Sequence, residues 1–405
     1  MLFRHSLRRL VHAVDELQRS LKIERSFTSR SGFLAFKDSF KRSFLNTKQD
    51  QCKKGYSVNM SAGDQAPEGV LLGLGNPLLD ITITADQEFL DKYGLQSNDA
   101  IIATEEHKPI FEEMVTKFEP LYRAGGATQN SIRVAQWLLQ KPKATSFIGG
   151  AGRDKFLDIL LKSAEKVGVN VKFDIHEEFP TGKCGAIIID EDRSLVTELG
   201  AANYFDSQFL NEPEIRTLIE KAKIFYIGGF MVPVSPGGVL LLAKHAAENN
   251  KVVVMNLHAK FLCKHFADPE LNLMQYVDVL FGNGDEAKQF GDECGFETSD
   301  VKEIALKAQA LPKLNEKRKR TIVFTQGKDP TVLGHDGQIN DYPITPVPKD
   351  LIKDTNGCGD AFVGGFLSQL AQNKPLDKCM KCGFYASRVV IQHYGCNYPD
   401  HPDFE

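Results

Sequence analysis

A short segment near the C-terminus combines a glycine-rich turn with one acidic side chain: residues 354–360 read DTNGCGD. Gly357 and Gly359 have no Cβ atom, so backbone N–H groups there can approach a charged ligand closely. The apolar spacing that follows predicts a helix over residues 361–372, and a helix N-terminus favours a phosphate group. Asp360 at that position could accept a proton from a substrate hydroxyl. A glycine loop in which Asp360 only caps the helix is the alternative.

Two further clusters lie beside predicted elements: one follows a strand, and the other precedes a helix. Asp80 ends the segment 73–80 (GLGNPLLD), and a carboxylate at a strand end can accept two hydrogen bonds from a vicinal diol. Gly125 and Gly126 precede a predicted helix, where they would let the backbone pass close to a substrate, with Asn130 in the first turn. Each cluster alone is also consistent with a surface turn or a helix cap.

A third group suits a nucleotide and its metal ion. Asn283 and Glu286 lie three residues apart at a predicted helix start, and such oxygen ligands suit Mg²⁺ or its bound waters. Helix capping by Asn283 is the alternative. Thr325 and Gly327 end a predicted strand and could line a nucleotide pocket, and Arg193 could reach over phosphates.

The elements that must position these residues alternate along the chain. Apolar runs predict strands over residues 70–74, 146–148, 185–189, 224–227, 252–256, 277–281 and 321–324, and helices over residues 128–139, 156–167, 214–223, 238–248 and 301–311. This alternation predicts an α/β fold with a doubly wound, mostly parallel sheet and helices on both faces. Ligands gather at the carboxyl ends of such strands. The segments at about 81–104 and 172–203 fit poorly and are predicted to form a small β-rich lid.

Composition separates a basic N-terminal segment from an acidic remainder. The chain has 405 residues, of which 42% are apolar, so it can bury a large core. Residues 1–68 contain 13 Lys and Arg against 7 Asp and Glu, whereas the remainder contains 36 against 46. We therefore predict an extension over residues 1–68, either disordered or targeting, and a catalytic domain over 69–405. The acidic domain argues against a nucleic-acid partner, and no apolar run is long enough to span a membrane.

Cysteine content and basic runs bear on location. The eight cysteines of a chain without a secretory signal indicate reduced thiols and a cytoplasmic protein, and the Cys379–Cys382 pair is more consistent with a helix than with zinc. Residues 317–320 (KRKR) are either a nuclear import signal or a solvated loop. The first fourteen residues resemble a mitochondrial transit peptide, but a non-catalytic extension before Met60 explains them equally well.

Taken in their order, these motifs resemble those of the ribokinase-type (PfkB) carbohydrate and nucleoside kinases. The matching strings include GNPLLD (75–80), GATQNS (126–131) and GFLSQL (365–370), and the resemblance covers about residues 69–405. It implies a monomer with a ribokinase-like fold that transfers the γ-phosphate of ATP to the 5′-hydroxyl of adenosine in purine salvage. It also implies Mg²⁺ as a cofactor, with K⁺ near Asp354 as a second candidate ion.

The resemblance also implies a role for each candidate residue. Asp360 would be the general base, and the amides of Gly357, Cys358 and Gly359 would form the anion hole. The substrate-binding residues would be Asn76, Asp80, Gly125, Gly126, Asn130, Cys184, Leu195, Phe230 and Phe261. The ATP and phosphate contacts would be Arg193, Asn283, Glu286, Thr325 and Gly327. Glu286 would hold Mg²⁺ through water.

Five residues depart from the family pattern. They are Ala100, Ala127, His258, Lys260 and Cys358, where Gln, Ser, Ser, Pro and Ala are usual. Changes near the nucleoside leave two alternatives open: a kinase for another nucleoside or sugar, and a catalytically weak nucleoside-binding protein. The cysteine in the anion turn predicts sensitivity to thiol reagents.

Overall fold

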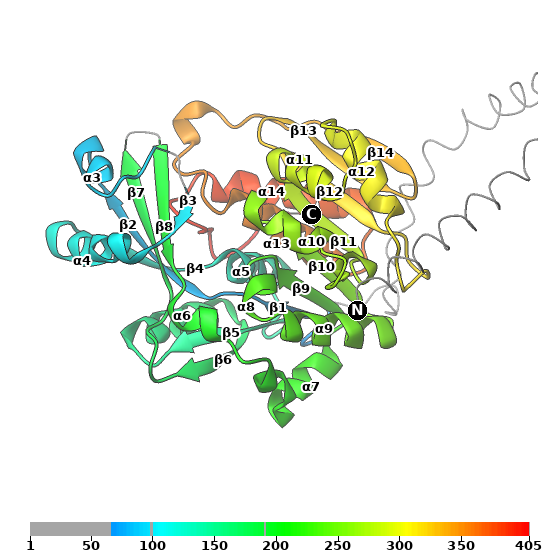
Figure 1. Ribbon diagram of the computed structural model, residues 1–405, viewed down its shortest axis with the longest axis horizontal. Coiled ribbons are helices and arrows are strands. Elements are labelled where there is room, and N and C mark those ends of the chain that lie inside the picture. The colour runs from blue at the N-terminus through cyan, green and yellow to red at the C-terminus, as the bar shows by residue number, and fades with distance from the viewer. Residues whose placement is uncertain (1–65, 98–99, 190–191, 405) are drawn as a thin grey trace, which may run out of the picture. The chain divides into compact units, whose positions relative to one another are not determined.

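Nine strands form the larger of two β-sheets, in the order β14-β13-β12-β11-β10-β9-β1-β5-β6 (Figure 1). Their bounds are β1 (Leu71–Leu74), β5 (Thr145–Gly152), β6 (Asn170–His176), β9 (Ile224–Gly228), β10 (Val252–Asn256), β11 (Val279–Asn283), β12 (Thr321–Gln326), β13 (Asp329–His335) and β14 (Gln338–Tyr342). All neighbours are parallel except β12 with β13 and β13 with β14. The predicted mostly parallel sheet is therefore confirmed.

The computed structural model describes residues 66–97, 100–189 and 192–404, which all belong to one unit, Lys54–Glu405. The predictions for residues 1–65, including the targeting signal and the start at Met60, lie outside the described residues. Among the described residues, no helix is both long and apolar enough to cross a membrane.

The smaller sheet has five strands in the order β3-β8-β7-β2-β4. Their bounds are β2 (Leu78–Thr84), β3 (Ala100–Ile102), β4 (Leu121–Gly125), β7 (Lys183–Ile189) and β8 (Asp192–Glu198). Four of these strands come from the two segments predicted as a lid, whereas β4 was not predicted. The start of the second segment was assigned wrongly, because residues 170–176 form β6 and pair with β5 in the larger sheet. A parallel β5-α6-β6 unit explains this, since its crossover helix returns the chain to the same sheet.

Helices cover both faces of the larger sheet, as predicted. The helices of the described residues are α3 (Gln87–Lys92), α4 (Lys108–Lys117), α5 (Ala127–Leu139), α6 (Lys155–Val167), α7 (Pro213–Lys221), α8 (Met231–Val234), α9 (Pro236–Glu248), α10 (Cys263–Ala267), α11 (Gly284–Glu293), α12 (Val301–Ala310), α13 (Cys358–Leu370) and α14 (Leu376–Val390). Of these, α4 contacts β7 of the smaller sheet. Alternate strand residues point to opposite faces, which divides the core in two. Tyr226 and Phe281 pack with α5, α13 and α14, whereas Phe225 and Leu280 pack with α7, α9, α11 and α12.

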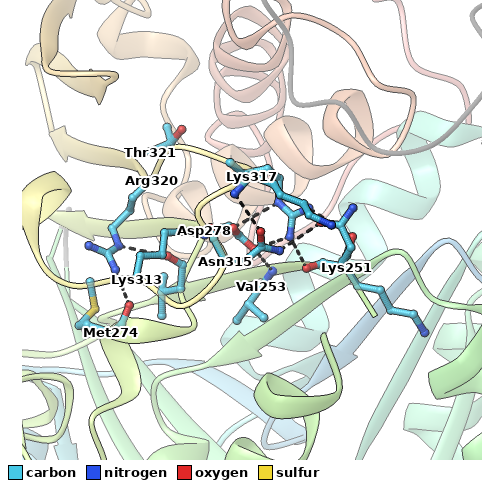
Figure 2. A network of polar contacts seen from close by, with 12 residues as sticks. Lys251, Val253, Met274, Asp278, Lys313, Asn315, Lys317, Arg320 and Thr321 are labelled. Carbon is cyan, nitrogen blue, oxygen red and sulfur yellow. Dashed lines mark hydrogen bonds and ion pairs between the residues drawn. The ribbon is translucent and has the colours of Figure 1, made fainter. Parts of the chain in front are cut away.

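The basic run at residues 317–320 is partly buried in a polar network (Figure 2). Arg320 is 2% exposed and donates hydrogen bonds to backbone carbonyls, among them that of Met274. Arg318 pairs with the buried Asp278 at 3.3 Å, and Lys313 pairs with the same carboxylate at 2.7 Å. The predicted solvated loop is therefore wrong for both arginines, because each guanidinium satisfies buried acceptors. A nuclear import receptor would have to extract these side chains.

Candidate active site

The glycine-rich turn leads directly into α13, which begins at Cys358 rather than at the predicted residue 361. Gly357 precedes the helix with φ +75°, and a Cβ there would lie 2.8 Å from the Cβ of Cys396. A Cβ on Gly359 would meet nothing within 4 Å. The first glycine is thus required by the fold, whereas the second leaves open space beside the first-turn amides, where an anion can approach.

Side chains fasten this turn to the following helix and the C-terminal segment. The Asp354 carboxylate accepts hydrogen bonds from the backbone N–H groups of Asn356 at 2.8 Å and Gly395 at 2.6 Å. The Ser387 hydroxyl donates to the carbonyl of Cys358 at 2.6 Å. These bonds hold the amides of the turn in place before any ligand binds, which is the condition for electrostatic stabilisation of a developing charge.

Asp360 lies in the first turn of α13 and contacts a residue 230 positions earlier in the chain. Asn130 of α5 donates from Nδ2 to Asp360 Oδ2 at 3.0 Å. Burial raises the pKa of Asp360 from its ordinary value of 3.8 to about 6, and the Asn130 hydrogen bond opposes this rise. The described structure contains no side-chain cap at the start of α13, so helix capping does not explain Asp360. An ionised carboxylate with a pKa near neutrality suits a general base.

The ends of β2 and β4 bring the sugar-binding candidates together. Asp80 pairs with Cys184 across β2 and β7, and a Cβ on Gly125 would lie 2.1 Å from Asp80 Oδ1. Gly126 has φ +89°, and its Cβ would lie 2.3 Å from the carbonyl oxygen of Asn76. Both glycines are therefore required for the close approach of neighbouring groups.

Several buried polar atoms beside these residues have no hydrogen-bond partner among the described residues. They are both side-chain polar atoms of Asn76, Oδ1 of Asn130 and both polar atoms of Gln129. An unpaired buried polar group costs about 1–3 kcal/mol, so such atoms suit a ligand rich in hydroxyl groups or ordered water. Gln129 was missed in the sequence, although a polar residue between Thr128 and Asn130 in a buried helix turn is a detectable signal.

Phe230 and Phe261 follow β9 and β10, and their ring centroids lie 6.2 Å apart. Phe230 is half-buried, whereas Phe261 is 53% exposed. Leu195 lies on β8, which is two strands from β2, and it pairs with Ala186 of β7. The structure therefore groups the two aromatic residues and places Leu195 on the separate, smaller sheet.

The proposed nucleotide residues lie at the ends of β11 and β12, where Asn283 pairs with Thr325. Asn283 and Glu286 form a reciprocal helix cap: Glu286 Oε2 accepts from Asn283 N at 2.9 Å, and Asn283 Oδ1 accepts from Glu286 N at 2.8 Å. Burial raises the pKa of Glu286 to about 7. Gly327 has φ +62° and open space around it. The alternative that Asn283 caps the helix is therefore confirmed. The cap places the side-chain oxygens of Asn283 and Glu286 together at the end of β11.

Two predictions for individual side chains have different outcomes. Arg193 lies on β8 opposite Ile188, but its side chain is outside the described structure. Cys358 is partly buried, and desolvation raises the pKa of its thiol from 9.0 to about 12. A protonated thiol is a weak nucleophile, so the predicted sensitivity to thiol reagents is not supported.

The geometry defines a class of enzyme. A partly buried carboxylate, an anion-binding helix start and a cluster of unpaired polar atoms suit a phosphotransferase that acts on a hydroxylated acceptor. The sequence profile of the pfkB family of carbohydrate kinases matches residues 87–403. The chain belongs to this family.

Similar proteins support the same class. Adenosine kinase 2 of Arabidopsis thaliana is 50% identical over 337 residues, covering 83% of this chain and 98% of the relative. The crystal structure of Anopheles gambiae adenosine kinase, in complex with P1,P4-di(adenosine-5) tetraphosphate, is 41% identical with a TM-score of 0.79, over 82% of this chain and 99% of that one. Schistosoma mansoni adenosine kinase in complex with 2-fluoroadenosine is 34% identical with a TM-score of 0.77, over 82% and 98%.

Proposed function

We propose that the protein transfers the γ-phosphate of ATP to the 5′-hydroxyl of adenosine, giving AMP and ADP in purine salvage. The observation that carries this proposal is the position of Asp360, hydrogen-bonded to Asn130 and one helix turn from an open anion site. The similarity to adenosine kinases over more than four fifths of the chain supports the choice of acceptor.

Each group has a defined part in the reaction. Asp360 accepts the proton of the 5′-hydroxyl as the oxygen attacks the γ-phosphorus. The amides of Gly357, Cys358 and Gly359 and the dipole of α13 stabilise the charge on the transferring group. Asp80 and Asn76 hold the ribose, so that the hydroxyl stays in line with the phosphate.

Mg²⁺ is the proposed metal, held through water by Glu286, with ATP as co-substrate. The residues fit, because a buried carboxyl whose pKa is raised to about 7 is stabilised in its charged form by a nearby cation. When bound, the ion neutralises charge on the ATP phosphates. K⁺ near Asp354 is proposed as a second ion, although that carboxylate already accepts two backbone hydrogen bonds.

The smaller sheet is proposed to act as a lid over the acceptor. Asp80 and Cys184 belong to this sheet, so movement of the sheet would change access to the site. Closure would exclude water and limit wasteful hydrolysis of ATP. We further propose that the enzyme is a monomer and acts in the cytoplasm.

A panel of acceptors tests the assignment. Transfer from Mg-ATP is measured to adenosine, inosine, guanosine, cytidine and ribose, and we expect the highest kcat/KM for adenosine. A preference for another acceptor would identify a kinase for a different nucleoside or sugar. This alternative is specific, because Ala127, His258 and Lys260 differ from the residues usual in the family. Adenosine binding without turnover of any acceptor would indicate a nucleoside-binding protein.

A further inference from the structure

His258 has an unusual backbone conformation at the carboxyl end of β10. Its φ is +63°, in the left-handed region that non-glycine residues rarely occupy. This conformation costs free energy, and such costs are concentrated at functional sites. The position also matters, because ligands of parallel α/β sheets bind beyond the carboxyl ends of the strands.

Hydrogen bonds fix both the orientation and the tautomer of the His258 ring. The backbone N–H of Gly229 donates to Nδ1 at 3.1 Å, so Nδ1 carries no proton. Nε2 therefore carries the proton and donates to the Tyr226 hydroxyl oxygen at 3.3 Å. Desolvation lowers the pKa of His258 from 6.5 to about 3, so the imidazole is neutral at physiological pH. Gly228 lies beside the ring: a Cβ there would be 3.3 Å from Cε1 of His258 and would clash with Thr128 Oγ1 at 2.1 Å.

The fixed imidazole lies against Phe230. The two ring centroids are 5.3 Å apart and the planes differ by 18°, which is an offset stack. Phe230 follows β9 and His258 follows β10, and the two strands pair in parallel up to Gly228 and Asn256. Phe230 is half-buried, and Phe261 meets it at 57°, so the imidazole supports a ring that remains accessible.

We propose that His258 is a positioning residue of the nucleoside site. By holding the Phe230 ring in one orientation, it favours acceptors that carry a flat base over a free sugar. The Tyr226 hydroxyl and the Gly229 amide keep the imidazole in the stacking plane. This inference rests on the proposed function, because it takes adenosine as the ligand.

His258→Asn isolates the stack. Asparagine tolerates positive φ and can still accept from the Gly229 amide, but it has no ring. We expect the dissociation constant of adenosine, measured by calorimetry, and its KM to rise about three- to tenfold. We expect kcat to stay within about twofold, because chemistry at Asp360 is untouched. KM for ribose should not change, and His401→Asn, at an exposed histidine near the C-terminus, serves as the matched control.

Phe230→Leu tests the other side of the stack and keeps the proposal falsifiable if His258→Asn does not fold. In a double-mutant cycle, the double variant should bind adenosine no more weakly than the weaker single variant. Independent, additive losses would overturn the proposal, as would unchanged adenosine binding in either single variant. If the wild-type protein binds adenosine without phosphorylating it, the proposed function fails while the cycle still decides the role of His258. Failure of the wild-type protein to bind adenosine would overturn both.

Discussion

Replacing Asp360 by asparagine should separate catalysis from stability. Asparagine has nearly the same shape, and its Oδ1 can still accept the hydrogen bond from Asn130 Nδ2. Only the charge and the capacity to accept a proton are lost. Nucleoside binding should therefore persist while phosphoryl transfer fails.

The loss of activity follows from the role of a general base. Such a group contributes about 10²–10⁴-fold to the rate, so kcat should fall by that factor in Asp360→Asn. The wild-type kcat/KM should rise as pH increases through about 6, where Asp360 ionises, and then level off. The residual rate of the variant should lack this dependence.

Although Asp360→Asn should lower activity, it should raise the free energy of unfolding at high pH. Burial raises the pKa of Asp360 from 3.8 to about 6, so between these values the folded state binds more protons than the unfolded state. The contribution of Asp360 to stability is fully present below about pH 4 and is lost as pH rises through about 6. The cost of the charge at pH 8 is about 1–3 kcal/mol, reduced from the full shift because the side chain is partly exposed. Asp360→Asn should recover that amount at pH 8, and the gain should vanish near pH 4.

Steady-state kinetics and urea unfolding at pH 4 and pH 8 measure both effects. Asp377→Asn is the matched control, because Asp377 lies in the first turn of α14, but its side chain is 43% exposed and pairs with Lys381. The Asp377→Asn variant should change neither kcat nor the pH dependence of the free energy of unfolding. Turnover of Asp360→Asn within about tenfold of wild type would refute the assigned base. A loss of stability at pH 8 would refute the argument from burial.

Three further predictions concern other parts of the molecule. Gly125→Ala places a Cβ within 2.1 Å of the Asp80 carboxylate and should raise KM for adenosine about tenfold or more, in the acceptor assay. Burial raises the pKa of the Cys358 thiol to about 12, so Cys358 should resist iodoacetamide at pH 8 in the folded protein and react after unfolding. Mass spectrometry measures the labelling, and rapid labelling of the folded protein would contradict the assigned burial. Asp278→Asn leaves the buried Arg318 charge unpaired and should lower the free energy of unfolding by about 3 kcal/mol without changing KM.

Much of the fold was predictable because it depends on local patterns. The apolar runs that became β9 and β10 are buried on both faces, as a central parallel strand requires, and they are recognisable without tertiary information. β4 was missed because its residues Leu121 and Tyr122 are exposed and lack an apolar run. The second lid segment was placed too early, because pairing of β6 with β5 is set by the crossover and not by composition.

For the site, the sequence was enough to choose candidate residues but not to find the residues that they contact. Asp80, Gly125 and Asp360 could be chosen because an acidic residue or paired glycines beside a predicted strand or helix are readily noticed in the sequence. The partners of these residues could not be chosen in this way. Arg318 and Arg320 show the same limit, since a basic run has the same appearance whether its side chains are solvated or bound to buried carbonyls.

The sequence by itself determined which elements form, where the glycines fall and which residue types are available for phosphoryl transfer, because these depend on side-chain chemistry and short-range spacing. Only the tertiary structure decided that Asn130 meets Asp360 and that His258 stacks on Phe230. It also decided the protonation behaviour of Asp360, Glu286 and Cys358, because desolvation depends on everything packed around a group. Contacts between residues far apart in the chain arise only when the packed sheet and helices bring their ends together.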